Sequence, residues 1–160
     1  FCDEGPMAGE PVIGLKVKLH DASLHEDAIH RGPSQMVPCT RDAMTRGFLQ
    51  STPRMIEPVR IIRIDVPTNV MGDAMTEVNN RRGDVLNMEE EGDSTILRCK
   101  IPVEEMFGFE AALKGATNGK GFFSAKDMIF EAMPMNLQEE KIMGIRERKG
   151  MKQEMPSLED

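Results

Sequence analysis

The chain lacks tryptophan and tyrosine altogether, and aromatic residues make up only 4% of it. Its apolar interior must therefore be built from aliphatic side chains and from 14 methionines, which fill irregular spaces well. Its three cysteines, Cys2, Cys39 and Cys99, are too few and too far apart for a disulfide framework or a zinc knuckle. Their odd number favours a reducing compartment. No apolar run approaches the roughly 20 residues of a membrane span, and the first residues do not have the pattern of a signal sequence.

Positive charge is also in deficit, with 20 lysines and arginines against 27 acidic residues and a formal net charge of -7. Bulk charge would repel nucleic acid, so any contact with RNA needs a local basic patch. The strongest candidate lies between residues 28 and 56. The ionised side chains there are four arginines and one aspartate: Arg31, Arg41, Arg46, Arg54 and Asp42. Arginines in such an island can bind phosphates, although a solvated helix face produces the same pattern more often. Arg81 with Arg82, and residues 146–152, form weaker patches.

The first regular pattern runs from residue 11 to residue 20. Apolar side chains alternate there with lysines, as in a half-buried strand: Ile13, Leu15, Val17 and Leu19 share one face. A lone strand leaves the backbone groups of both edges unpaired. We therefore expect residues 11–20 to pair with a second copy of the chain or to be poorly ordered. A polar turn follows, and then a helix that begins at Pro33 and ends near residue 51.

A second unit extends from Val59 to Met133 in the order strand, helix, strand, strand, helix, strand. This order predicts the ferredoxin-like split βαβ arrangement, an antiparallel four-stranded sheet with both helices on one face. Thr68 is expected to cap the first helix and Gly83 to end it. Gly92 marks a hairpin turn. A second amphipathic helix is expected to carry the apolar repeat of Met106, Phe109, Leu113 and Ala116.

The expected fold class is therefore α+β, in three parts. Residues 1–56 supply only a partial βα unit, residues 57–134 form the ferredoxin-like domain, and residues 135–160 form a C-terminal helix with a tail. A chain that starts with an incomplete unit is expected to be a piece of a longer protein.

Three histidines, His20, His25 and His30, recur every five residues and suggest a metal site. This interval fits neither one face of a helix nor one face of a strand, so the three rings are expected to point apart. Asp27 precedes His30 by three residues, as in a carboxylate that orients a catalytic imidazole. No recognisable nucleophile motif or phosphate-binding glycine loop accompanies the pair. We expect no catalytic residue, cofactor or metal ligand in the chain.

The segment from Leu24 to Gly32, LHEDAIHRG, resembles the tip loop of elongation factor 2, the archaeal and eukaryotic branch of the elongation factor G family of translational GTPases. Further motifs agree in the same order: Glu57-Pro58, Met71-Gly72-Asp73, Asn80-Arg81-Arg82-Gly83, Met106-Phe107-Gly108-Phe109, Ala116-Thr117-Asn118-Gly119 and Arg146-Glu147-Arg148-Lys149-Gly150. Pro33-Ser34 stands where eukaryotic members have further glycines, and this departure resembles the archaeal members.

The resemblance implies a C-terminal fragment, namely the last part of the fourth domain (residues 1–56) and the complete fifth domain. In this family the tip of the fourth domain enters the decoding centre of the small ribosomal subunit behind tRNA and mRNA. The fifth domain lies near the stalk base of the large subunit. His30 corresponds to the histidine that is converted to diphthamide, and the implied tip contacts with RNA are Asp27, His30, Arg31 and Gly32. Further candidate contacts are Arg41, Arg46, Arg81 and Arg82.

The resemblance also implies a cytoplasmic protein whose partners are the ribosome and the enzymes of diphthamide synthesis, with no membrane. GTP and magnesium would bind to a domain outside this chain, so the fragment itself is expected not to be an enzyme. A different class of function stays open from the residues alone: a stand-alone ferredoxin-like module that binds a small ligand through its sheet or helix ends.

Overall fold

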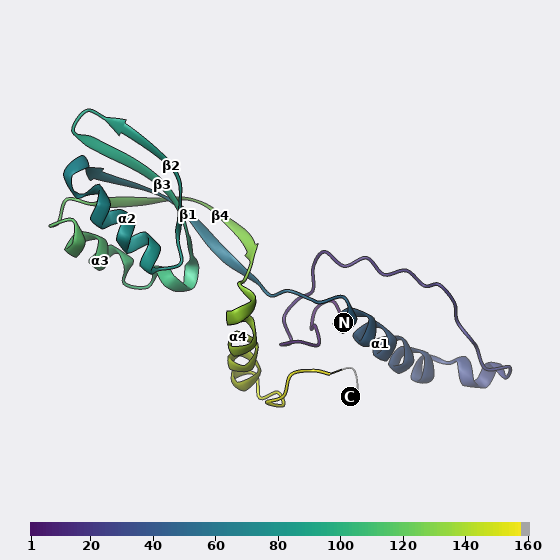
Figure 1. Cartoon of the computed structure of the whole chain (residues 1–160). Helices are drawn as coiled ribbons and strands as arrows, with labels where there is room; N and C mark the ends of the chain where they lie inside the picture. The colour runs from purple at the N-terminus through teal and green to yellow at the C-terminus, as the bar shows by residue number, and fades with distance from the viewer. Residues whose placement is uncertain (158–160) are drawn as a thin grey trace. The chain divides into compact units, whose positions relative to one another are not determined.

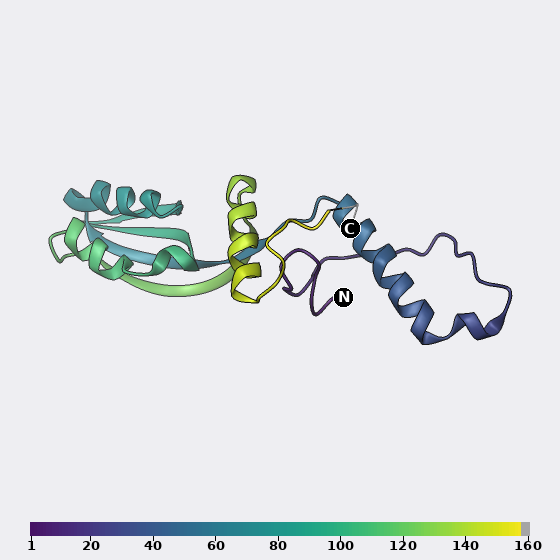
Figure 2. The same cartoon turned by 90° about the horizontal axis from the view of Figure 1, so that it is seen from below.

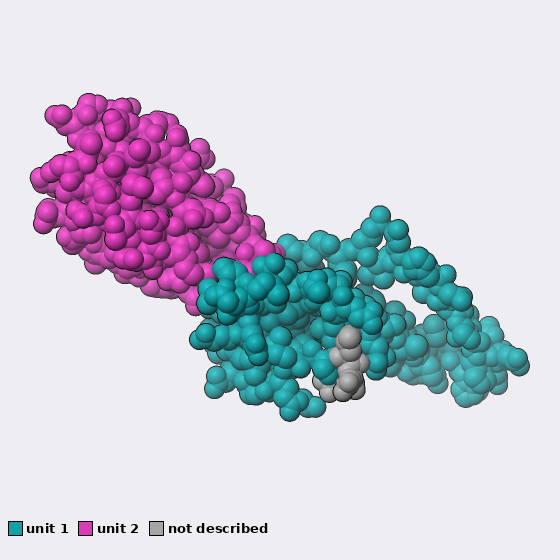
Figure 3. All heavy atoms as spheres, viewed as in Figure 1, with its two compact units in different colours: residues 1–55, 134–160 teal, residues 56–133 magenta. Residues whose placement is uncertain are grey.

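The computed structural model describes residues 1–157, and the last three residues of the expected tail lie outside the described residues. The chain divides into two compact units (Figure 3). Residues 56–133 form one unit, and residues 1–55 form the other together with residues 134–160. The C-terminal helix thus groups with the N-terminal residues.

The unit of residues 56–133 contains four strands and two α-helices. In chain order they are β1 (Ile56–Pro67), α2 (Met71–Asn80), β2 (Asp84–Glu91), β3 (Ser94–Pro102), α3 (Phe109–Ala116) and β4 (Phe122–Ala132). The strands form one antiparallel sheet in the order β2-β3-β1-β4 (Figure 1). The predicted ferredoxin-like arrangement is confirmed, and with it the α+β class.

The core of this unit lies between the sheet and the two helices. Alternate residues of the central strands point into it because side chains of a strand alternate between faces. The sheet contributes Ile62, Ile64, Val66, Leu97, Cys99 and Ile101, and the helices contribute Ala74, Val78, Phe109 and Leu113. Phe109 also meets the ring of Phe123 edge to face, with centroids 5.1 Å apart. Both helices therefore cover the same face of the sheet (Figure 1).

The hairpin between β2 and β3 follows the prediction. Glu91 and Ser94 pair at its end, and Gly92 between them has a φ of 61°. This left-handed conformation favours glycine.

The ends of the first helix differ from the prediction. Thr68 lies in a short 3-10 helix, η2 (Thr68–Val70), and its hydroxyl lies 3.0 Å from that of Thr95 instead of capping α2. The left-handed residue after α2 is Arg82, with a φ of 54°, and not Gly83. Gly83 is required for space, since a Cβ there would lie 2.7 Å from Cγ1 of Val78.

The start of the second helix was also predicted wrongly. Met106 ends a separate 3-10 helix, η3 (Val103–Met106). Gly108, with a φ of 72°, lies in left-handed conformation just before α3 and separates the two helices. Left-handed backbone cannot continue a right-handed helix. The apolar spacing of Met106 and Phe109 is real, but a turn separates them.

The unit of residues 1–55 and 134–160 contains two α-helices, α1 (Pro33–Gln50) and α4 (Met135–Arg148), where helices were predicted. Residues 11–20 do not form the predicted strand. They run as an extended segment that returns to the start of α1 (Figure 2), with Ile13, Val17 and Leu19 exposed. A strand is held by hydrogen bonds to a neighbour, and the described residues of this unit contain no other strand.

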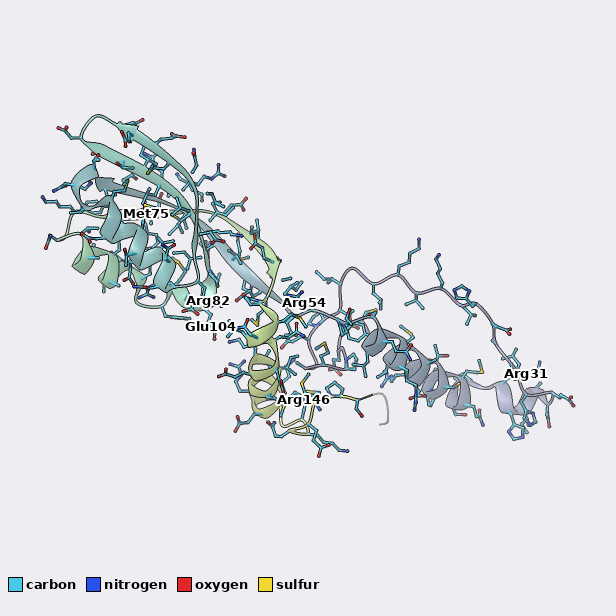
Figure 4. All side chains as sticks on the ribbon, in the orientation of Figure 1. Arg31, Arg54, Met75, Arg82, Glu104 and Arg146 are labelled. Carbon is cyan, nitrogen blue, oxygen red and sulfur yellow. The ribbon has the colours of Figure 1, made fainter. Side chains whose placement is uncertain are left out.

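A small core of this unit joins α4 to the N-terminal residues. Met7, Ala8 and Ile142 are buried, with Phe48 and Ile145 packed against them. Arg146, labelled in Figure 4, is buried beside this core. Its Nε donates to the carbonyl of Lys152 at 2.7 Å and its Nη1 to that of Met7 at 2.8 Å. Arg146 therefore belongs to the interior and not to a basic surface patch.

Candidate functional site

The candidate tip loop lies between the extended segment and helix α1. A 3-10 helix, η1 (Ala28–Arg31), forms its end, and none of its residues is buried. Asp27 caps this helix, because its Oδ1 accepts the backbone N–H of Ile29 at 3.1 Å. The sequence explains the fold locally, since aspartate is a preferred N-cap. The loop is thus ordered by polar contacts and stands open to solvent.

His30 lies in η1 with its ring against that of His25. The two ring centroids are 4.5 Å apart with an interplanar angle of 65°. The expectation that the histidine rings point apart was wrong for this pair, because the loop folds back on itself. The backbone N–H of His30 donates to the carbonyl of Asp27 at 3.2 Å. The carboxylate of Asp27 is directed at Ile29, so the geometry does not assemble a catalytic aspartate and histidine pair.

Arg31, labelled in Figure 4, donates two hydrogen bonds to backbone carbonyls of the loop. Its Nε donates to the carbonyl of His25 at 2.6 Å, and its Nη2 donates to the carbonyl of Glu26 at 2.8 Å. The predicted RNA contact is therefore also an internal bridge across the loop. Nothing in the spacing of charges indicated this role, since the acceptors are backbone groups.

Gly32 joins the loop to α1 as the N-cap residue of that helix. Its φ of -71° and ψ of 164° are open to any residue. Its carbonyl accepts the N–H groups of Gln35 and Met36, both at 3.0 Å. The turn therefore does not depend on the conformational freedom of glycine.

The two predicted contacts on α1 differ in their surroundings. Arg46 forms an exposed ion pair with Asp42 one turn earlier, with Nε 3.1 Å from Oδ2. Arg41 is exposed on the same helix. Asp42 therefore offsets the charge of Arg46 in the basic island.

Arg81 and Arg82 lie after α2 and bind groups of their own unit. Arg81 donates to Glu77 and to the carbonyls of Glu105 and Phe107, at 2.6 to 2.8 Å. Arg82 forms ion pairs with Glu57 and Glu105. The hydrogen bond that Arg82 donates to Glu57 raises the pKa of Arg82 against the opposing effect of burial. Both side chains thus hold η3 against the end of α2.

An apolar hollow of about 780 Å³ lies between the extended segment and α1. Its lining includes Leu15, Val17, Met36, Met44 and Phe48. Helix α1 has no buried residue along its 18 positions. An apolar face left open in this way is typical of a surface that another segment covers.

Residues 1–157 offer neither a metal site nor a membrane-spanning helix. This part of the chain has no group of three or more histidine, cysteine or acidic side chains that could hold a metal ion. Nor does any helix in it combine the length and the apolar composition that a membrane span requires.

Comparisons with known proteins match both units to one family. Residues 1–52 match the model of elongation factor G domain IV, and residues 54–141 match the model of the elongation factor G C-terminus. Archaeal proteins named elongation factor 2 are similar over most of this chain. The protein of Archaeoglobus fulgidus is 49% identical over 156 residues, which are 98% of this chain and 21% of that protein. Those of Halobacterium salinarum and Methanocaldococcus jannaschii are each 49% identical, over 96% and 94% of this chain and 21% of their own length. The chain thus spans about a fifth of the length of these relatives.

Proposed function

The chain belongs to the family of elongation factor G and elongation factor 2, and on that premise we propose that it is the ribosome-contacting part of a translocase. Such a protein would promote the GTP-dependent movement of tRNA and mRNA in the cytoplasm. GTP and magnesium would be bound by a GTPase domain, which lies outside the two regions that this chain matches. In this proposal the tip loop enters the decoding centre of the small subunit, and residues 56–133 contact the stalk base of the large subunit.

The observation that carries the proposal is the open loop around His30. It stands at the end of an 18-residue helix, its short η1 helix has no buried residue, and residues 20–31 are all exposed. A polar loop on a stiff helix can approach RNA closely without rearrangement, and the arginines of the helix would be attracted to the phosphates. The family match supplies the partner.

We propose that His30 is the residue converted to diphthamide and that the diphthamide-synthesis enzymes are therefore partners. An unmodified histidine is only partly charged near neutral pH, whereas diphthamide carries a fixed cation on a longer side chain. Such a group would strengthen contact with RNA at the tip. The exposed position of His30 supports this assignment because a modifying enzyme must reach the ring.

The test uses the intact protein made in cells that synthesise diphthamide. We expect diphtheria toxin to ADP-ribosylate the wild type and the His20→Ala control, since His20 lies in the extended segment outside the loop. The His30→Ala variant should take up no label. Intact mass and peptide mapping should find the added mass of diphthamide on the peptide that contains His30. Labelling retained in His30→Ala would overturn the assignment.

Contact with the ribosome is tested separately, by binding of the intact protein to purified small subunits. We expect binding that weakens with salt, and weaker binding for Arg41→Ala than for the wild type. A thermal-shift screen with metabolites provides the comparison with a small-ligand module. A metabolite that stabilises the chain, together with no binding to subunits, would overturn the proposal.

A further inference from the structure

The tip loop is closed by one side chain that reaches back across it. Arg31 lies at the end of η1 and bonds the carbonyls of His25 and Glu26, six and five residues earlier in the chain. Both bonds are short, at 2.6 and 2.8 Å, and their donor is charged. Hydrogen bonds from a charged donor are about twice as strong as neutral ones. Arg31 therefore fixes the width of the loop.

His25 completes the closure from the other side. Its Nδ1 accepts the backbone N–H of Asp27 at 3.0 Å, so its ring is oriented by the main chain. The same ring meets the ring of His30 at 4.5 Å. An Nδ1 that accepts a hydrogen bond carries no proton, which places the proton of the neutral ring on Nε2. His25 thus links the backbone of the loop to the orientation of His30.

Apolar packing does not hold this part of the chain. Residues 20–31 are all exposed, so the side chain to backbone bonds carry the order of the loop. Two of these bonds are donated by Arg31 to backbone carbonyls. The other two are donated by backbone N–H groups, that of Asp27 to His25 and that of Ile29 to the side chain of Asp27. Loss of the arginine bridge would leave the loop free to sample other shapes.

We propose that Arg31 and His25 are positioning residues that preform the loop and present the His30 ring in one orientation. This inference rests on the proposed function of His30 as the modified contact residue. Any partner that reads His30, whether the modifying enzyme or RNA, then meets a loop that is already in its binding shape. Preformed shape lowers the entropy cost of binding.

The proposal assigns Arg31 a role that its charge alone cannot fill. Lysine keeps the positive charge, but its single ammonium group does not reproduce the planar fork that reaches two carbonyls. Arg31→Lys therefore separates positioning from simple attraction to phosphate. Arg98→Lys is the matched control, because Arg98 is an exposed arginine of strand β3 in the other unit and has no part in the loop.

His25 permits a similar separation of its two contacts. His25→Asn keeps an acceptor near the position of Nδ1 but removes the ring, and His25→Phe keeps a ring against His30 but removes the acceptor. His25→Ala removes both. Because the loop is exposed, these changes leave the packed cores of the two units untouched.

The structural test is NMR of the 160-residue chain with labelled histidines. The wild type should show His25 with its proton on Nε2 and a nuclear Overhauser effect between the rings of His25 and His30. Arg31→Lys and His25→Ala should lose this effect, and Arg98→Lys should retain it. In His25→Phe the ring contact should persist while the signal of the Asp27 amide shifts, and His25→Asn should show the reverse. An unchanged ring contact in Arg31→Lys would overturn the role of Arg31, and unchanged His30 signals in His25→Ala would overturn that of His25.

The functional test is the rate of diphthamide formation in the intact protein with purified synthesis enzymes. We expect Arg31→Lys to be modified at least about tenfold more slowly than the wild type, because a misplaced reacting group costs rate steeply. Arg98→Lys should match the wild type. Equal rates for the two lysine variants would overturn the positioning role. If the wild type itself is not modified at His30, the proposed function fails, while the ring contact measured by NMR still decides whether the loop is preformed.

Discussion

Arg82 binds Glu57 through two parallel hydrogen bonds, from Nη1 to Oε1 at 3.0 Å and from Nη2 to Oε2 at 2.9 Å. The side chains are only 26% and 10% exposed. The Nε of Arg82 also bonds Oε1 of Glu105 at 3.0 Å. One guanidinium therefore connects the end of α2, the start of β1 and helix η3. Arg82 therefore has a structural role in its own unit, independent of any contact that it makes with RNA.

We predict that Arg82→Ala lowers the free energy of unfolding of the chain by about 2 kcal/mol, because it leaves the Glu57 carboxylate unpaired in a nearly buried position. Urea unfolding followed by circular dichroism would measure this loss. The control is Arg63→Ala, which removes an ion pair to Asp65 whose side chains are 42% and 44% exposed. Exposed pairs contribute about 1 kcal/mol or less, so equal losses in the two variants would contradict the structural role of Arg82.

Gly83 provides a second prediction about the same corner. A Cβ at this position would lie 2.7 Å from Cγ1 of Val78 and 2.8 Å from Cγ1 of Ile101. We expect Gly83→Ala to destabilise the chain by about 2 kcal/mol through overpacking. The measurement is again urea unfolding.

The control for Gly83 is Gly115→Ala in helix α3, where an added Cβ meets nothing within 4 Å. There the change should stabilise the chain by up to about 1 kcal/mol, since alanine favours a helix over glycine. Destabilisation of similar size in both variants would show that the space around Gly83 is not the cause.

The fold of residues 56–133 was predictable because its signals are local. Ile62, Ile64 and Val66 alternate in β1 as a buried strand requires, and Gly92 marks the hairpin within two residues. The extended segment at residues 11–20 carries the same alternation but forms no strand. Alternation shows which face would be buried, whereas a strand also needs a neighbour, and the local sequence does not contain one.

The sequence did not indicate the internal contacts of the tip loop. The exposed loop around His30 lies where the resemblance indicated, and the family itself is confirmed. The bridge from Arg31 ends on backbone carbonyls, which every residue has, so no sequence pattern marks it. Similarly, Arg82 meets Glu57 at a separation of 25 residues, and charge patterns within one segment cannot reveal such a pair.

Cys99 should be the unreactive thiol of the three. Cys2 and Cys39 are exposed and Cys99 is buried, and burial raises the pKa of the Cys99 thiol to about 11. Since the thiolate is the reactive form, a thiol reagent at pH 8 should modify two cysteines quickly and the third only when the chain unfolds. Rapid modification of all three in the folded chain would contradict the buried position of Cys99.

The same thiol predicts a pH dependence of stability. Below pH 9.0, the ordinary pKa of this thiol, Cys99 is protonated in both the folded and the unfolded chain. In that range it does not make the free energy of unfolding depend on pH. Between pH 9.0 and about pH 11 the unfolded chain ionises it while the folded chain keeps it protonated. The free energy of unfolding should therefore fall over this range by about 1.4 kcal/mol per pH unit from this group. Urea unfolding at several pH values would show a smaller slope for Cys99→Ala than for the wild type.

The apolar face of residues 11–20 leads to a prediction about the isolated chain. Ile13, Val17 and Leu19 are 69%, 60% and 84% exposed, next to the open apolar hollow on α1. Burial of such surface is worth about 25 cal/mol per Å², and unpaired strand edges invite pairing with another chain. We propose that two chains associate through this segment.

Light scattering over a range of concentrations should then show a mass above that of a monomer. Val17→Lys should return the mass to that of the monomer, because a buried lysine has no partner there. The control is Lys18→Gln on the opposite face of the segment, which should leave association unchanged. A monomer at all concentrations, with amides of residues 13–19 protected from exchange, would contradict the proposal, because the segment would then be paired within its own chain.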